Sequence, residues 1–283
     1  MAAANGSRLA NLRFLVGLAR AAGGALIFSL PLLMTMELWW LGFYMGRLQL
    51  ALLTLVTFPL LVLLSHYVGF ERTFDWREDV VDALAAYAVA VIMAVVLHPL
   101  LVIAAPGDSF SEIIGKIALQ AVPGAIGALL ALSQLGQAQE EDGSRRRHWQ
   151  EEPSYPRELF LMLLGALFLS LNLAPTEEMV LIGHRMPPLY SLLLVVLSLL
   201  LMHAFVYSVE FRGQHDPGNG HPGHARLFLH YTVAGYGIVL LTSLFILWTF
   251  GRFEGIGMLD VVAITVVLAF PASIGAAAAR LIL

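Results

Sequence analysis

Long apolar stretches, separated by shorter polar ones, follow one another along almost the whole chain, and this pattern predicts an all-helical membrane protein. Each stretch is close to the ~20 residues that a helix needs to cross the hydrocarbon core of a bilayer. The polar stretches between them supply the expected loops. We predict eight transmembrane helices, at about residues 22–45, 48–68, 80–104, 112–135, 158–182, 189–210, 227–250 and 258–281.

Two segments of the first half recur in the second half and predict an internal duplication. Residues 29–42 (SLPLLMTMELWWLG) align without a gap with residues 170–183 (SLNLAPTEEMVLIG), and six of the fourteen positions are identical. Residues 123–131 align with residues 271–279, with five of nine positions identical. Internal repeats are typical of transporters and channels, in which the functional site often lies at the repeat interface. We therefore predict two four-helix repeats.

A polar stretch near the middle of the chain separates the two predicted repeats. Its acidic and basic runs are typical of a solvated connection. The predicted organisation is a cytoplasmic N-terminal segment at residues 1–21, a first repeat at 22–136, a cytoplasmic linker at 137–157 and a second repeat at 158–283.

Basic residues collect on one side of the predicted spans, and cytoplasmic loops of membrane proteins carry such an excess. Of the sixteen Lys and Arg residues, twelve fall on the side of the N-terminus. Both termini are therefore expected in the cytoplasm. Each repeat has an even number of helices, so the two should enter the membrane in the same direction, as parallel repeats. The opposite, outer side keeps only Arg47, Lys116, Arg185 and Arg252.

Composition agrees with a membrane location and excludes several kinds of site. The chain is 59% hydrophobic and 13% charged, whereas soluble domains average about 45–50% and about 25%. It contains no cysteine, which excludes disulfides, thiolate metal sites and thiol catalysis. Neither an enzyme motif nor a long basic tract for nucleic acid is present, so we expect no enzyme, no cofactor and no nucleic-acid partner.

Carboxylates inside the predicted helices are the strongest functional candidates, because each costs several kcal/mol in a membrane unless it is paired or hydrated. The duplication preserves a Thr-x-Glu pattern, Thr35 with Glu37 and Thr176 with Glu178, and Glu177 lies beside the second pattern. A proline before each pattern frees a backbone carbonyl, and oxygen ligands suit cations. We predict that these residues bind a cation or proton at the repeat interface. The alternative is that they are interfacial carboxylates paired with arginines.

Other polar residues fall near the ends of predicted helices. Glu112 and Asp260 would form an outer ring of carboxylates, and Lys116 is spaced to pair with Glu112. The alternative is that both carboxylates simply favour a helix start through the helix dipole. Histidine titrates near neutral pH, so a proton relay is a further hypothesis for three residues: His98, His203 and His230.

Small residues at four-residue spacing predict close contacts between helices. Pro123 and Gly127 in the first repeat correspond to Pro271 and Gly275 in the second. Faces of this kind let two helices approach closely in a membrane.

Four stretches of the chain, SLPLLMTMELWW, DALAAYAV, GKIALQAVPGAIGA and NLAPTEEM, resemble an uncharacterised bacterial integral-membrane family known only as a domain of unknown function. The resemblance extends from about residue 22 to the end, outside the linker. It implies a bacterial inner-membrane location and supplies neither an activity nor a site.

The leading prediction is a membrane cation channel or transporter for a divalent cation, sodium or protons. Its partners would be the lipid bilayer and the transported ion, with a homo-oligomer left open. The alternative is a non-transporting membrane sensor or assembly partner that acts through its cytoplasmic linker and a histidine-rich loop. That loop could also bind a metal, although its spacing matches no zinc pattern, through His215, Asp216, His221 and His224.

Overall fold

The computed structural model describes residues 2–68, 76–105, 107–137, 154–213 and 228–282, and the regular structure in these ranges is helical throughout. Within them, eight helical segments are long and apolar enough to cross a membrane. The predicted all-helical class and the predicted number of spans are therefore confirmed. The chain divides into two compact units, unit 1 (Met1–Glu151) and unit 2 (Glu152–Leu283).

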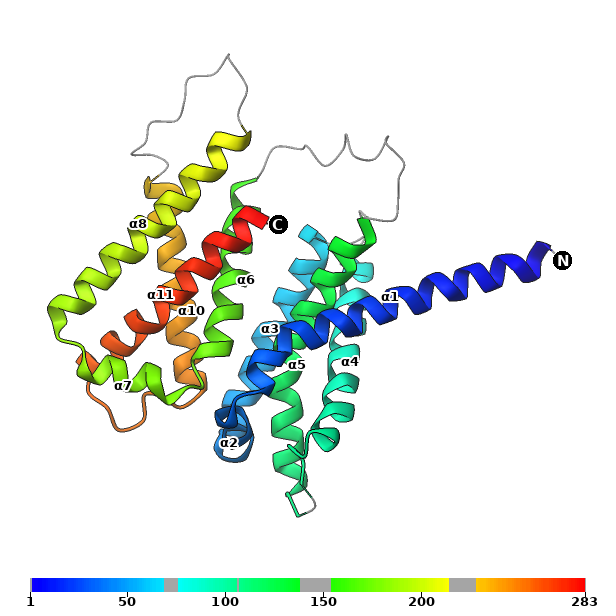
Figure 1. Ribbon diagram of the computed structural model, residues 1–283, viewed down its shortest axis with the longest axis horizontal. Coiled ribbons are helices and arrows are strands. Elements are labelled where there is room, and N and C mark those ends of the chain that lie inside the picture. The colour runs from blue at the N-terminus through cyan, green and yellow to red at the C-terminus, as the bar shows by residue number, and fades with distance from the viewer. Residues whose placement is uncertain (1, 69–75, 106, 138–153, 214–227, 283) are drawn as a thin grey trace. The chain divides into compact units, whose positions relative to one another are not determined.

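In unit 1, one helix forms the centre of the packing (Figure 1). This helix, α5, packs against the other four described helices of the unit. Its side chains Leu119, Val122 and Ile126 are fully buried, as expected for a helix surrounded by others. The described helices of unit 1 are α1 (Ala2–Leu33), α2 (Met36–Tyr44), α3 (Arg47–Val68), α4 (Trp76–Leu100) and α5 (Phe110–Gln137).

In unit 2, the last helix, α11, holds the corresponding central place and packs against α6, α7, α8 and α10. The core around it contains Met162, Met202, Tyr236 and Val239, together with small alanines. The described helices of unit 2 are α6 (Tyr155–Leu173), α7 (Glu177–Arg185), α8 (Pro188–Gly213), a π-helical turn η1 (Phe228–Val233) that leads into α10 (Ala234–Thr249), and α11 (Met258–Ile282).

Glycines make the closest helix contacts inside each unit. Gly24 on α1 lies against Gly127 on α5, and Gly165 on α6 lies against Gly275 on α11. A Cβ atom on any of the four would overlap the carbonyl oxygen of the facing glycine. The close packing predicted around Gly127 and Gly275 is therefore confirmed, and in both places only glycine fits without a shift of the helices.

Two of the predicted spans, 22–45 and 158–182, are not single helices. The first spanning segment is Leu15–Leu33, and the short helix α2 follows it as a separate element. The second spanning segment ends at Leu173, and α7 follows it in the same way.

A threonine in extended conformation marks each break. Thr35 (ψ 130°) precedes α2, and Thr176 (ψ 137°) precedes α7. In unit 2 the break follows from Pro175, which has no backbone N–H to continue the helix. In unit 1 hydropathy gave no warning of the break, because the apolar run continues through it. In unit 2 the break coincides with a short polar stretch, Thr176, Glu177 and Glu178.

Candidate functional site

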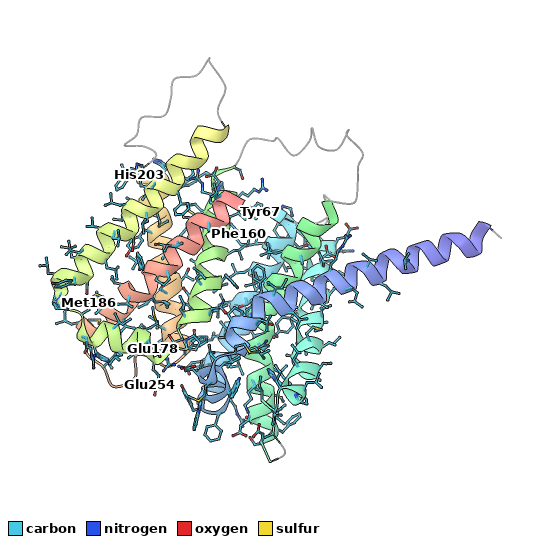
Figure 2. The ribbon with its side chains drawn as sticks, in the orientation of Figure 1. Tyr67, Phe160, Glu178, Met186, His203 and Glu254 are labelled. Atoms are coloured by element: carbon cyan, nitrogen blue, oxygen red, sulfur yellow. The ribbon has the colours of Figure 1, made fainter. Side chains whose placement is uncertain are left out.

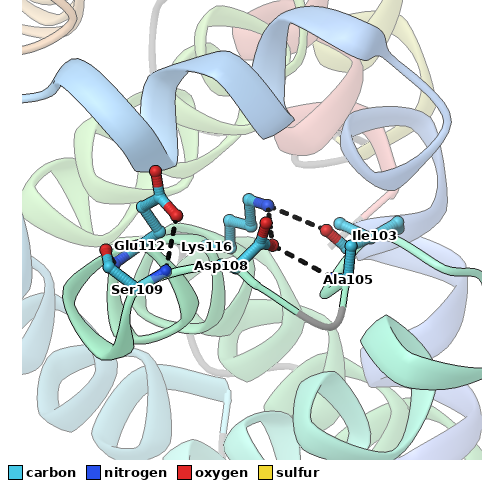
Figure 3. A network of polar contacts seen from close by, with 6 residues as sticks. All are labelled: Ile103, Ala105, Asp108, Ser109, Glu112 and Lys116. Atoms are coloured by element: carbon cyan, nitrogen blue, oxygen red, sulfur yellow. Dashed lines mark hydrogen bonds and ion pairs between the residues drawn. The ribbon is translucent and has the colours of Figure 1, made fainter.

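A buried lysine lies near the start of α5 in unit 1 (Figure 3). Lys116 Nζ donates to the carbonyl oxygen of Ile103 at 2.8 Å and to Asp108 Oδ2 at 2.7 Å. The Lys116 side chain is only 9% exposed, and that of Asp108 is 22% exposed. The backbone N–H of Ala105 also donates to Asp108, at 3.1 Å. These contacts stabilise an ammonium that the membrane interior would otherwise exclude.

A strained turn at the end of α4 forms one side of this lysine site. Val102 has φ 58°, a left-handed conformation that a β-branched residue rarely adopts. The N–H of Ile103 donates to the His98 carbonyl at 2.8 Å, and the N–H of Val102 donates to the Pro99 carbonyl at 3.2 Å. This is the hydrogen-bond pattern of a helix C-cap that normally uses glycine. Backbone strain of this kind concentrates at functional sites.

Two further polar side chains are buried at the same end of unit 1. His98, on the last turn of α4, is 1% exposed, and Gln120, one helical turn after Lys116, is 2% exposed. Neither ring nitrogen of His98 and neither amide atom of Gln120 has a hydrogen-bond partner among the described residues. Since buried polar groups are nearly always paired, each of these needs an explanation. We call His98, Asp108, Lys116 and Gln120 the lysine cluster.

A second polar cluster lies at the opposite end of α4. His66 Nδ1 is 2.9 Å from Asp79 Oδ2, and Asp79 is 1% exposed. The His66 ring stacks on Trp76 with 4.7 Å between centroids, and Ser65 Oγ donates to Asp82 Oδ2 at 3.3 Å. We call these five residues the histidine cluster. The sequence does not reveal this cluster, because His66 lies in the last turn of α3 and both aspartates lie near the start of α4.

Small residues form the buried face of α4 between the two clusters. On α5, Gly124 lies directly against Ala90, so the two helices approach closely. The face therefore forms a close-packed apolar seam with a titratable group at each end. Its buried residues, in order, are Asp79, Ala83, Ala86, Val89, Ala90, Ala94 and His98.

Comparison with known proteins places the chain in a membrane family. A family model described as "Putative integral membrane protein (DUF2391)" matches residues 17–283. The chain belongs to this family. The resemblance seen in the sequence is confirmed, and the family description names no activity. No curated protein and no solved structure matches the chain.

The predicted ion pair between Glu112 and Lys116 is wrong. Glu112 instead forms a capping box with Ser109: the Ser109 N–H donates to Glu112 Oε2 at 2.8 Å, and the Glu112 N–H donates to Ser109 Oγ at 3.3 Å (Figure 3). Glu112 thus acts as a helix-start carboxylate, and Lys116 pairs with Asp108 from the preceding turn. Membership of Glu112 in an outer ring stays a prediction.

The Lys116–Asp108 pair predicts a loss of stability in acid. The hydrogen bond from Lys116, and then that from Ala105, lowers the pKa of Asp108 below its usual 3.8. A lowered folded-state pKa stabilises the fold above the unfolded-state pKa, and this contribution is lost as pH falls through the folded-state pKa. We expect the stability difference between wild type and Asp108→Asn to shrink below about pH 4. Thermal unfolding in detergent from pH 6 to pH 2.5 measures it, and a difference independent of pH would contradict the assignment.

The two glutamates predicted to bind an ion lie in the first turns of short helices. Glu37 is half-buried in α2, and Glu178 is exposed in α7 next to the exposed Glu177 (Figure 2). A carboxylate in the first turn is favoured by the helix dipole. Because Glu37 belongs to unit 1 and Glu178 to unit 2, their pairing stays a prediction.

The two predicted threonines act alike at their helix breaks. Thr35 Oγ1 donates to the Leu32 carbonyl at 2.9 Å, and Thr176 Oγ1 donates to the Leu173 carbonyl at 2.7 Å. Each hydroxyl therefore satisfies a carbonyl at the end of a helix. Each hydroxyl oxygen keeps lone pairs for a further partner.

The neighbouring carbonyls at the breaks are also occupied. In unit 1, Trp39 Nε1 donates to the Leu33 carbonyl at 3.2 Å. In unit 2, Arg252 Nε donates to the Ala174 carbonyl at 3.2 Å, and its terminal nitrogen donates to the Pro175 carbonyl. A guanidinium thus occupies two backbone carbonyls next to the predicted cation site of unit 2.

The remaining predicted residues of unit 2 have local partners. Asp260 Oδ1 lies 3.2 Å from His184 Nδ1, with both side chains partly exposed. His203 on α8 lies 3.1 Å from Thr232 Oγ1 (Figure 2). His230 is exposed in η1, and its carbonyl accepts a hydrogen bond from a tyrosine hydroxyl.

Metal binding finds little support in the described part of the chain. No group of three His, Cys, Asp or Glu side chains there is arranged to hold a metal ion. The histidine-rich loop, with His215, Asp216, His221 and His224, lies outside the described residues, as does most of the predicted linker.

A buried ion pair links α6 and α11 in unit 2. Arg280 Nη2 and Nε both lie 2.7 Å from Glu158 Oε2, and the side chains are 8% and 10% exposed. The guanidinium also lies over the Tyr231 ring, 4.3 Å from its centroid. In the sequence, Arg280 is one of the twelve basic residues on the side of the N-terminus, and no nearby residue indicates its partner, Glu158.

Proposed function

We propose that this protein carries protons across the membrane through unit 1, as a channel or a secondary transporter. The observation that carries the proposal is the pair of titratable clusters at the two ends of one buried face of α4. Charged and polar groups in membrane helices are expensive and mark ion or proton pathways. Lys116 and His98 are buried at one end of this face, and His66 and Asp79 meet at the other.

The chemistry of the two clusters favours protons over divalent cations. Divalent cations such as calcium and magnesium need several oxygen ligands, from carboxylates, carbonyls and waters. The lysine cluster instead holds an ammonium, which would repel such an ion, beside an imidazole and an amide. A neutral imidazole both donates and accepts hydrogen bonds and can pass a proton from one side to the other.

The proposal includes the membrane orientation predicted from the sequence. Two four-helix repeats would enter a bacterial inner membrane in the same direction, with both termini in the cytoplasm. The distribution of arginines supports this orientation. The matching contacts of Gly24 with Gly127 and of Gly165 with Gly275 support the repeat. Glu37 and Glu178 would then attract cations at the outer face.

Proton flux into liposomes that contain the purified protein tests the proposal. With an internal pH-sensitive dye and an imposed potential, we expect flux in wild type and none above background for Asp79→Asn, because an amide cannot release a proton. Glu254→Gln, an exposed carboxylate outside both clusters, is the matched control and should keep full flux. Absence of proton flux in wild type, across pH and voltage, would overturn the proposal.

The same flux assay tests whether Glu37 and Glu178 take part in proton transport. The Glu37→Gln, Glu178→Gln double variant should lose most of the flux if both carboxylates take part. Sodium- and calcium-sensitive dyes, used in parallel, identify a different ion if one passes. Full flux in the double variant would remove both glutamates from the pathway and leave the proposal for unit 1 intact.

A further inference from the structure

We infer that the proton-binding site belongs to unit 1 alone, and that unit 2 contains an apolar counterpart of the same site. The inference rests on the proposed function and names the binding residues as His98, Lys116 and Gln120. The alignment of residues 123–131 with residues 271–279 can be extended toward the N-terminus at the same offset. It then pairs Lys116 with Ile264.

Contacts inside the two units agree with this pairing. Gly42, on α2, lies against the backbone of Lys116, and a Cβ atom there would overlap it. Gly183, on α7, lies against the backbone of Ile264 in the same way. The alignment of residues 29–42 with residues 170–183 pairs Gly42 with Gly183. The contact of Gly42 with Lys116 is therefore equivalent to that of Gly183 with Ile264, and the two alignments agree.

The same registers identify the counterparts of the other two residues. Gln120 pairs with Leu268 by the register of Lys116. When that register is shifted by one residue, Tyr87 aligns with Tyr236, and His98 then pairs with Leu247. All three counterparts, Leu247, Ile264 and Leu268, are fully buried. Unit 2 therefore fills with apolar side chains the places where unit 1 buries an imidazole, an ammonium and an amide.

This difference between the units distinguishes residues that helix packing requires from residues that a function requires. The same helix arrangement forms in unit 2 with apolar residues, so packing alone does not require polar ones. In unit 1 the side-chain polar atoms of His98 and Gln120 are buried without partners among the described residues, which lowers stability. A stability loss at a position that can be apolar indicates a ligand, and the mixed donors and acceptors suit water and a proton.

A cavity and several ionisable groups lie near the site. A cavity of about 240 Å³ lies between α2, α3 and the start of α5, and it reaches Gly115 and Leu119, the neighbours of Lys116 and Gln120 in the chain. The ionisable groups carried by the elements packed around this part of α5 are Glu37, Arg47, Asp108 and Glu112.

Replacing two of the polar residues by their unit 2 counterparts tests the inference. The His98→Leu, Gln120→Leu variant leaves the Lys116–Asp108 pair in place. We expect proton flux to fall to that of protein-free liposomes, while the melting temperature stays equal or rises. Asn172→Leu is the matched control and should keep its flux. Asn172 is a buried polar residue of unit 2, and its side-chain oxygen has no hydrogen-bond partner in the part of the chain that the structure describes. Full flux in the folded double variant would overturn the inference and leave the proposed function standing.

Histidine-selective NMR gives a second readout that does not depend on flux. With isotope-labelled imidazole in wild type, the His98 signal should titrate with pH, and Gln120→Leu should shift its midpoint. A His98 signal unaffected by pH or by Gln120→Leu would overturn the inference, even where the double variant fails to fold. Wild type without flux but with a titrating His98 would instead count against the proposed function.

Discussion

Replacing Arg280 by methionine should destabilise unit 2 by about 3–5 kcal/mol, the usual cost of leaving a buried charge without its partner. Arg280 makes two contacts of 2.7 Å to Glu158 and also covers the Tyr231 ring. Without the guanidinium, the Glu158 carboxylate stays buried and loses its ion pair, and the charge of Arg157 compensates it only in part. Thermal or denaturant unfolding of the purified protein in detergent measures the loss.

The double variant Glu158→Leu, Arg280→Leu should recover most of that stability, because apolar side chains often replace a buried ion pair without loss. Unit 1 supports this expectation. The alignments pair Glu158 with Gly17 and Arg280 with Leu132, and a Cβ atom on Gly17 would lie 3.9 Å from Leu132. If the double variant were as unstable as Arg280→Met, apolar side chains could not replace the ion pair, and the expectation would be wrong.

Replacing Gly24 by alanine should destabilise unit 1 by about 1–3 kcal/mol or more, the cost of forcing an extra group into a packed interior. The new Cβ atom would overlap the Gly127 carbonyl and the Ala131 side chain, so α1 and α5 would have to separate. Since α5 is the central helix of unit 1, that separation would weaken its other contacts as well.

The neighbouring residue provides a matched control in the same helix. A Cβ atom on Gly23 would meet nothing within 4 Å. Gly23→Ala should therefore raise stability by up to about 1 kcal/mol, because alanine favours a helix more than glycine does. Melting temperatures of the two single variants, measured side by side, give the comparison. Equal effects of Gly23→Ala and Gly24→Ala would contradict the described contact between α1 and α5.

The spans were predictable because hydropathy and length are local properties of the sequence. The helix breaks were not, since they depend on groups that satisfy the freed carbonyls. In unit 1 this group is Trp39, a few residues away, but in unit 2 it is Arg252, on a loop more than seventy residues later. No local pattern indicates that such a distant side chain will reach the end of α6.

The site was predictable only in part, for a similar reason. Lys116 and His98 stand out as ionisable residues in apolar segments, and the sequence identified both. The partner of Lys116 was wrong, because Asp108 reaches it through a turn that places Val102 in a conformation valine rarely adopts. His66 was overlooked because its meeting with Asp79 depends on how α3 and α4 pack.

The apolar seam of α4 has an electrical consequence. Asp79 and His98 are 19 residues apart in one helix, which corresponds to about 28 Å at ~1.5 Å per residue. That length is close to the ~30 Å thickness of the hydrocarbon core, across which the membrane voltage falls. A charge passed from one end of the seam to the other would cross nearly the whole field, at ~2.3 kcal/mol per 100 mV. The membrane potential itself would then drive or oppose each transfer along α4.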